Sequence, residues 1–191
     1  MMRRWMGLLT GLAALAACGP RNPQVELRTP GGDIRIELYA DRAPLTVAHF
    51  LRHVDEGRYA TASFYRVHLS PAQLMKPASG FVQGGIWYGD TTRMLPPIPL
   101  ESTRKTGLRH TDGIVSLARF DAPGSGRGEF SIMVGDQPQL DWHDDSPAGQ
   151  GYAAFGKVVA GMDVVRAIQA LPTNGERLRR AIPITAIRRV P

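Results

Sequence analysis

Cysteine is almost absent from this sequence, since Cys18 is the only one in 191 residues. No disulfide can therefore form within the chain, and no cysteine after residue 18 is available as a catalytic nucleophile. Stability has to come from a packed core, for which a hydrophobic content of 43% is sufficient. The length suits a single domain. The 21 glycines and 15 prolines favour many turns between short strands over long helices.

Long apolar runs are also missing. The longest, from Trp5 to Ala17, has 13 residues, fewer than the roughly 20 that a membrane-spanning helix needs. Arg3 and Arg4 precede it, which is typical of a secretory signal peptide. The run ends in Leu-Ala-Ala-Cys-Gly, which resembles the lipobox of bacterial lipoproteins, where cleavage leaves the cysteine as a lipidated N-terminus. The alternative is an ordinary signal peptide in which Cys18 is incidental.

This N-terminal pattern predicts the domain organisation and the location of the protein. We expect a signal peptide at 1–17, a tether at 18–23 and one domain at 24–191. The protein is then exported and held on the periplasmic side of the cell envelope by lipidated Cys18, its only contact with a membrane. Gly19 stands where an aspartate resembles an inner-membrane retention signal in some bacteria, so we expect the outer membrane.

The charge of the chain is moderately basic. Without residues 1–17, 21 basic and 17 acidic residues remain, and the net charge falls from +6 to +4. Much of the excess lies near the end of the chain, in Arg177, Arg179, Arg180, Arg188 and Arg189. No aromatic residues are interleaved with a basic run, so this pattern indicates a solvated basic face and argues against a nucleic-acid partner. Attraction of this face to anionic lipid or lipopolysaccharide head groups is the alternative.

The periodicity of apolar residues predicts a mainly β fold. Residues 33–39 alternate between apolar and polar, the pattern of a half-buried strand. Residues 43–57 carry apolar side chains at the spacing of one helical face, and residues 161–171 do the same. The strands are expected at 24–28, 33–39, 63–67, 80–85, 113–118, 129–134, 152–159 and 184–190.

Eight strands and two helices predict a closed eight-stranded antiparallel β-barrel with two capping α-helices. The interior of such a barrel is filled by side chains, so a ligand must bind on the outer wall. Polar residues within the strands are therefore the informative ones. In the stretch FYRVHLSPAQLMKPASGFVQGG, Arg66 and Gln83 are polar members of two otherwise apolar runs on either side of a loop.

The common catalytic and metal-binding motifs are missing. The glycine-rich run 123–128 has no following Lys-Ser/Thr and no helix, so it is not a phosphate-binding loop. The acidic run 141–145 leads into a Ser-Pro-Ala-Gly turn and indicates a solvated loop. His49 and His53 lie four residues apart on the first helix, but no third ligand is evident nearby, which favours two histidines on the helix surface over a metal site.

Taken in order, several segments resemble those of one family. The motifs FYRV, GFVQGG, GIVSLAR, GEFSIMVG, QLD and AAFGKVVAGMDVV occur in the order and at the spacing seen in the cyclophilins, the peptidyl-prolyl cis-trans isomerases. The resemblance covers roughly residues 25–190. It implies the same eight-stranded barrel, an X-Pro isomerase activity without cofactor or metal, proline-containing polypeptides as substrates, and a monomer.

The chemistry implied by this resemblance suits Arg66. Rotation about a peptide bond is opposed by a barrier of about 18–20 kcal/mol, and the catalyst must favour the twisted amide over both planar forms. Twisting localises the lone pair on the nitrogen, which can then accept a hydrogen bond from a guanidinium. Arg66 matches the catalytic arginine of the family, and Gln83 matches the residue that holds the substrate backbone.

The resemblance also implies a binding groove for the proline ring and its neighbours. Phe81 shares a strand face with Gln83 and should form an apolar wall. The remaining expected substrate-binding residues are Ala118, Arg119, Glu129, Ser131, Leu140 and Tyr152.

Three of these residues depart from the family pattern. Glu129 replaces a glutamine, Ser131 a phenylalanine at the pocket floor, and Tyr152 a histidine. Burial of a phenylalanine contributes about 1.5–3 kcal/mol, so Ser131 predicts weaker proline binding. Two hypotheses follow: an isomerase that assists the folding of exported proteins, or a non-catalytic scaffold that binds a proline-containing envelope partner.

Overall fold

The computed structural model describes residues 22–70 and 79–190. The expected signal peptide, Cys18 and most of the tether lie outside these residues, as does most of the loop between Arg66 and Gln83. Among the described residues, no helix is long and apolar enough to cross a membrane.

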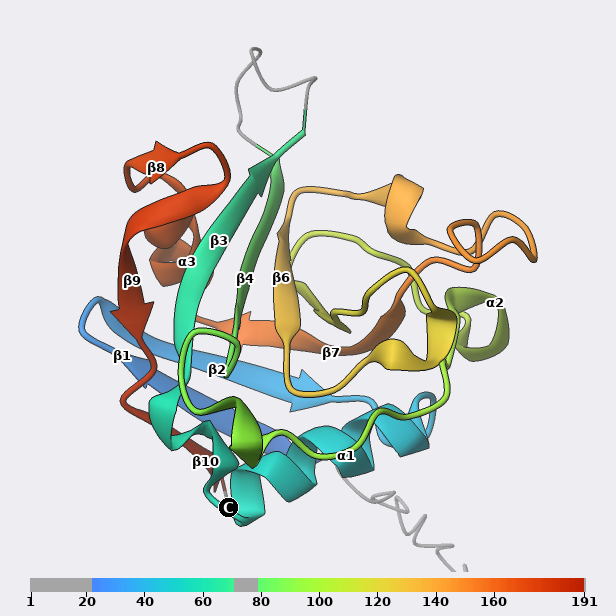
Figure 1. Cartoon of the computed structure of the whole chain (residues 1–191), viewed down its shortest axis with the longest axis horizontal. Coiled ribbons are helices and arrows are strands. Elements are labelled where there is room, and N and C mark those ends of the chain that lie inside the picture. The colour runs from blue at the N-terminus through green and yellow to red at the C-terminus, as the bar shows by residue number, and fades with distance from the viewer. Residues whose placement is uncertain (1–21, 71–78, 191) are drawn as a thin grey trace, which may run out of the picture.

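In the described residues, one antiparallel sheet of ten strands forms the body of the molecule, and helices pack against it (Figure 1). Its strands are β1 (Gln24–Thr29), β2 (Gly32–Leu38), β3 (Ser63–Leu69), β4 (Gly80–Gly85), β5 (Ile114–Leu117), β6 (Phe130–Val134), β7 (Ala153–Ala160), β8 (Thr173–Asn174), β9 (Arg177–Pro183) and β10 (Ala186–Val190). Their order in the sheet is β10-β1-β2-β7-β5-β6-β4-β3-β9-β8. The predicted mainly β fold class is confirmed.

The chain itself joins the two ends of this sheet. Strand β10 lies at one end of the order and β9 next to the other end, and only Ile184 and Thr185 separate them in sequence. The amide of Ile184 donates to the carbonyl of Ala62 beside β3, and that of Thr185 donates to the carbonyl of Arg28 in β1, both at 2.9 Å. The sheet therefore curls into a barrel whose seam is this crossing segment.

The prediction of eight strands was too low, because the hairpin β8–β9 was missed. Of the seven residues of β9, only Leu178 is buried. The strand thus lacks the alternating apolar pattern that reveals a half-buried strand. Its arginines, interpreted from the sequence as a basic face, lie on a strand that pairs with β3.

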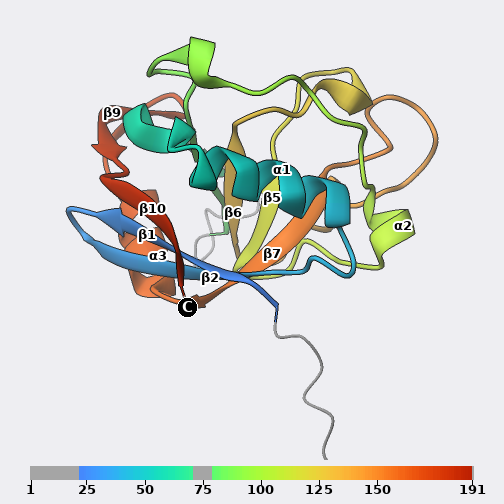
Figure 2. The same ribbon diagram turned by 90° about the horizontal axis from the view of Figure 1, so that it is seen from below.

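Three α-helices are present in the described residues instead of the expected two. The predicted ones are α1 (Pro44–Asp55) and α3 (Met162–Gln169), and the additional α2 (Thr103–Thr106) is a single turn. Helix α1 begins at Pro44 and buries Val47, Phe50, Leu51 and Val54, so it lies across one end of the barrel (Figure 2). Helix α3 packs against β2 and β4.

Aromatic side chains fill the barrel. Phe50, Phe64, Phe130 and Phe155 are fully buried, and the ring of Phe130 contacts those of Phe50 and Phe64 edge to face at 5.7 and 5.9 Å. Edge-to-face pairs of this kind add to the free energy that burial alone contributes. Among the described residues the core is thus filled by packed side chains, which directs attention to the outer wall.

The two histidines of α1 are buried, so their placement on the helix surface was wrong. His53 donates from Nδ1 to the carbonyl of His49 at 2.9 Å, and its Nε2 accepts from the amide of Leu95 at 3.2 Å. His49 Nε2 lies 2.8 Å from the carbonyl of Arg127. The described residues contain no group of three or more side chains that could hold a metal ion.

The free energy of unfolding is expected to fall as the pH drops below neutral. Burial lowers the pKa of His53 from 6.5 to about 4, so between these values the unfolded chain binds a proton that the folded chain does not. The folded state therefore loses stability from about pH 6.5 down to about pH 4, by about 1.4 kcal/mol per pH unit. Urea unfolding at pH 7 and pH 5 measures this.

His53→Gln is the control for this prediction, because its amide can donate and accept a hydrogen bond but does not titrate. The variant should show a smaller loss between pH 7 and pH 5 than the wild type. His49 and His110 retain part of the effect, since burial lowers their pKa values too. Equal losses in the two proteins would contradict the role of His53.

Candidate active site

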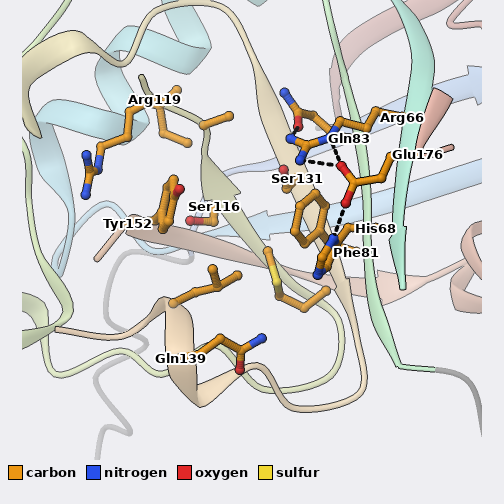
Figure 3. A pocket seen from close by; sticks show the side chains of 14 residues that line it. Arg66, His68, Phe81, Gln83, Ser116, Arg119, Ser131, Gln139, Tyr152 and Glu176 are labelled. Carbon is orange, nitrogen blue, oxygen red and sulfur yellow. Dashed lines mark hydrogen bonds and ion pairs between the residues drawn. The ribbon is translucent and has the colours of Figure 1, made fainter. Parts of the chain in front are cut away.

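A cavity of about 270 Å³ lies on the outer wall of the barrel (Figure 3). It is lined by Arg66, His68, Phe81, Gln83, Ser116, Leu117, Ala118, Arg119, Ser131, Met133, Gln139, Leu140, Tyr152 and Glu176. Eight of the nine expected site residues within the domain are in this lining, and the exception is Glu129. The structure thus brings together residues from the four strands β3, β4, β5 and β6, from the turn η5 (Pro138–Leu140) and from the segments that flank these strands.

The register of the sheet sets the polar residues of the cavity in one row. Arg66 in β3 is paired with Gln83 in β4, Gln83 with Ser131 in β6, and Ser131 with Ser116 in β5. Paired residues on one face of a sheet have their Cβ atoms about 4.5–5.5 Å apart. Four neighbouring strands therefore present one polar side chain each across the cavity wall.

A β-bulge in β3 turns Arg66 toward the outside. Phe64 is fully buried in the core, and residues two apart on a regular strand share a face, so Arg66 would also point inward. The register shifts between Phe64 and Arg66 in the pairing with both β4 and β9. The extra residue, Tyr65, reverses the alternation, so Arg66 and His68 both face the cavity.

The guanidinium of Arg66 is held on two sides (Figure 3). One terminal nitrogen donates to Oε1 of Gln83 at 2.8 Å. On the other side, Nε and the second terminal nitrogen lie 2.7 and 2.6 Å from Oε2 of Glu176. These contacts use three of the five N–H donors of an arginine. The other two have no partner among the described residues and remain free for a ligand.

Gln83 is oriented in turn from behind the cavity. Its Nε2 donates to the hydroxyl of Tyr65 at 2.9 Å, and that hydroxyl donates to Oε2 of Glu129 at 2.5 Å. Burial and the negative charge of Glu129 raise the pKa of Tyr65, so the hydroxyl keeps its proton. The donors are therefore assigned along the whole series: Arg66 donates to Gln83, Gln83 to Tyr65, and Tyr65 to Glu129. The oxygen of the Gln83 amide consequently faces Arg66.

Glu129 itself acts from outside the cavity. Its Oε1 accepts from the amides of Ile86 and Trp87 at 2.6 and 2.9 Å. It lines a neighbouring hollow that also contains Trp87 and Phe120. Burial raises the pKa of Glu129, although these hydrogen bonds oppose the shift. Its place in the structure is to support Tyr65 and Gln83, and its expected contact with substrate stays a prediction.

An apolar recess lies beside the polar row. Phe81, Met133 and Leu140 line it, and Met133 is almost completely buried. The ring of Phe81 stacks on His68, with centroids 5.0 Å apart, and the Cζ of Arg66 lies 5.4 Å from its centre. Ser131, which is 7% exposed, lines the cavity between this recess and Gln83. The arrangement suits a small apolar ring next to a polar backbone.

Comparison with known proteins identifies the family. The cyclophilin-type peptidyl-prolyl cis-trans isomerase model matches residues 24–189. The chain is 35% identical over 164 residues to peptidyl-prolyl cis-trans isomerase cyp18 of Streptomyces antibioticus, covering 85% of this chain and 93% of the relative. It is 34% identical over 160 residues to peptidyl-prolyl cis-trans isomerase B of Escherichia coli K12, covering 83% and 92%.

The chain belongs to the cyclophilin family. It is a peptidyl-prolyl cis-trans isomerase, as its curated relatives are. A solved cyclophilin of Cryptosporidium parvum shares the fold with a TM-score of 0.70 at 21% identity, covering 89% of this chain and 98% of that one. A second structure of that protein, with a TM-score of 0.68 over 86% and 96% of the two chains, is described as in the presence of the dipeptide Ala-Pro.

In this cyclophilin Arg119 is engaged by the backbone. Its guanidinium donates to the carbonyls of Gly151, Phe120, Asp121 and Pro147 at 2.7–2.9 Å. Its Cζ lies 4.9 Å from the ring centre of Tyr152. Arg119 therefore holds the loop before β7 and the ring of Tyr152 in place, while its expected contact with substrate stays a prediction.

A buried trio supports the floor of the cavity. His110 Nδ1 lies 2.7 Å from Oδ1 of Asp141, and its Nε2 lies 2.9 Å from Oγ of Ser116. These residue types match those of a hydrolytic triad, but Ser116 is only 2% exposed and its hydroxyl is turned to His110. The trio joins β5 to the segment that follows Leu140, and it indicates a structural role.

Sequence reasoning missed six residues of the cavity lining: His68, Ser116, Leu117, Met133, Gln139 and Glu176. Glu176 was hidden because the hairpin β8–β9 was not predicted. Asn174 pairs with Arg177, so Gly175 and Glu176 form the two-residue turn, and Gly175 at its first position has the positive φ of 60° that such a turn requires. His68 was hidden by the bulge in β3, which brings it to the outer face.

Removal of the Tyr65 hydroxyl is expected to weaken catalysis moderately. Tyr65→Phe takes away the group that fixes the amide of Gln83 and leaves Nε2 of Gln83 without this acceptor. Since one hydrogen bond contributes about 0.5–1.5 kcal/mol, kcat/KM should fall about 3- to 10-fold. Tyr39→Phe, which removes a hydroxyl outside the cavity, should leave kcat/KM unchanged, and an equal effect of both substitutions would contradict the proposed link.

Proposed function

We propose that this cyclophilin isomerises X-Pro bonds of exported proteins in the cell envelope, with Arg66 as its catalytic group and Gln83 as the residue that holds the substrate backbone. The observation that carries the roles of these residues is the orientation of Arg66. Its guanidinium lies at the cavity wall next to an apolar recess, with two N–H donors that have no partner in the described part of the chain.

The reaction needs no bond to be made or broken. The proline ring enters the recess of Phe81, Met133 and Leu140, and the second N–H of the Gln83 amide donates to a backbone carbonyl of the substrate. As the amide twists, its nitrogen gains a lone pair, and the free donors of Arg66 approach it. This contact exists only in the twisted form, so it lowers the barrier without strengthening the binding of the planar forms.

The isomerase assay on the wild type and on Arg66→Ala tests this assignment. The rate of cis-trans exchange of a short proline peptide is measured for both proteins, by NMR exchange or with a coupled protease. We expect kcat/KM to fall about 100-fold or more, as when a preorganised donor is removed from other active sites. Equal rates would overturn the role of Arg66.

A non-catalytic scaffold is the alternative function. Ser131 favours it, because a serine in the wall next to Gln83 gives less apolar contact with a proline ring than a phenylalanine does. In that case a proline peptide binds in the cavity, as seen from chemical shift changes of Gln83 and Phe81, while its exchange rate stays at the uncatalysed value.

The N-terminal sequence supports the envelope location. A short apolar run after Arg3 and Arg4 and the Leu-Ala-Ala-Cys-Gly sequence favour export and lipidation at Cys18. Mass spectrometry of the native N-terminus measures whether the mature chain begins with a lipidated Cys18. A Cys18→Ala variant should leave the membrane fraction, and its retention there would contradict the lipid anchor.

A further inference from the structure

Glu176 forms the outer side of the grip on Arg66. It is the second residue of the Gly175-Glu176 turn that joins β8 to β9, and both contacts of its Oε2 are to the Arg66 guanidinium, at 2.7 and 2.6 Å. Without them, the only side-chain hydrogen bond that orients Arg66 in the described residues is the one to Gln83. A single bond leaves the planar group free to rotate about its long side chain.

Glu176 is itself held in place by two further contacts. Its backbone carbonyl accepts from the amide of Val67 at 2.8 Å, which fixes the turn to β3. Its Oε1 lies 2.5 Å from Nδ1 of His68, and the ring of His68 stacks on Phe81. Partial burial raises the pKa of Glu176, but the hydrogen bonds from His68 and Arg66 outweigh it and lower the pKa. The group at this position is an ionised carboxylate.

We propose that Glu176 is a positioning residue of the isomerase, which holds the two free donors of Arg66 toward the amide nitrogen of the substrate. The proposal rests on the catalytic role proposed for Arg66. It assigns a catalytic consequence to the hairpin β8–β9, an element that contributes no residue to the recess for the proline ring.

Two opposing effects decide whether loss of Glu176 raises or lowers the rate of isomerisation. The carboxylate partly neutralises Arg66 and so weakens its attraction for the nitrogen lone pair. However, the side chains of Arg66 and Glu176 are 41% and 43% exposed, and the interaction of such a solvated ion pair is small. Misplacement of a reacting group by about 1 Å can cost 100-fold in rate. Orientation therefore outweighs neutralisation, and loss of Glu176 should slow the reaction.

The kinetic test compares three variants of the full chain. Glu176→Ala should lower kcat about 10-fold and change KM less than 2-fold, since the recess for the ring is intact. Glu176→Gln should regain most of the kcat, because its amide oxygen can still accept from Arg66. Asp55→Ala is the matched control: Asp55 also accepts two hydrogen bonds from an arginine, Arg189, at 46% exposure, but it lies on α1 away from the cavity. It should retain the wild-type kcat.

A spectroscopic readout separates this proposal from the function on which it rests. The Nε–H signal of Arg66 in NMR reports the contact with Glu176 whether or not the protein is active. It should be protected from exchange in the wild type and in Glu176→Gln, and lost in Glu176→Ala. If the wild type is inactive, the catalytic role of Arg66 fails, and the Nε–H signal alone shows whether Glu176 fixes Arg66. A wild-type kcat or an unchanged Nε–H signal in Glu176→Ala overturns the proposal.

Discussion

Arg66→Lys is expected to lose about 100-fold or more in kcat/KM, nearly as much as Arg66→Ala. A lysine keeps the positive charge but replaces a planar fork of five donors by one ammonium group. That compact group does not have the planar fork with which Arg66 contacts Gln83 on one edge and Glu176 on another while it directs further donors to the substrate. The result distinguishes a need for geometry from a need for charge. It is measured as the exchange rate of a proline peptide at saturating and subsaturating concentrations.

Arg177→Lys is the matched control for this substitution. Arg177 lies opposite Arg66 on the adjacent strand β9, is exposed, and places its Cζ 4.2 Å from the ring centre of Tyr88 rather than against a carboxylate. Its replacement by lysine should leave kcat/KM within about 2-fold of the wild type. If Arg66→Lys retained a third or more of the wild-type activity, charge alone would suffice and the assigned geometry would be wrong.

The sequence predicted the site best where the strand pattern is regular. In β4, alternation places Phe81 and Gln83 on the outer face and Val82 in the core, and the structure agrees. In β6, it places Phe130 inside and Ser131 outside, and this agrees as well. A period of two is a reliable guide there because one face of each strand is buried in a filled barrel.

The same reasoning fails at β3, the strand that carries Arg66. Phe64 is fully buried, so strict alternation would bury Arg66 as well, and only the bulge at Tyr65 prevents this. In the sequence, the resemblance to the cyclophilins identified Arg66, and periodicity did not. A bulge depends on the pairing of both neighbouring strands, and a single strand sequence does not carry that information.

The departure of Glu129 from the family pattern has a structural explanation. A glutamine at this position would bring an NH₂ group as well as an oxygen, whereas all three groups that contact Glu129 donate to it: the amides of Ile86 and Trp87 and the hydroxyl of Tyr65. A carboxylate only accepts. Glu129 therefore accepts the hydrogen bond of the Tyr65 hydroxyl, and Tyr65 in turn orients the amide of Gln83. Glu129 thus acts on Gln83 through Tyr65, a link that sequence comparison alone does not reveal.

The largest effect on stability is expected for Phe130→Ala. Phe130 is fully buried, and its ring contacts those of Phe50, Tyr59 and Phe64. Deletion of the ring leaves a cavity that the surrounding barrel closes only in part, so the free energy of unfolding should fall by about 3–5 kcal/mol. Urea unfolding followed by circular dichroism measures this difference.

Phe120→Ala is the comparison that isolates burial from side-chain type. Phe120 is 60% exposed, so its loss should cost less than about 1 kcal/mol. Similar losses in both variants would contradict the assignment of Phe130 to the centre of the core. The position also bears on the active site, because Glu129 directly precedes Phe130 at the start of β6, Ser131 directly follows it, and both face the opposite way. If the Phe130 ring anchors that strand, a folded Phe130→Ala protein should show a lower kcat even though the lost ring lies behind the cavity wall.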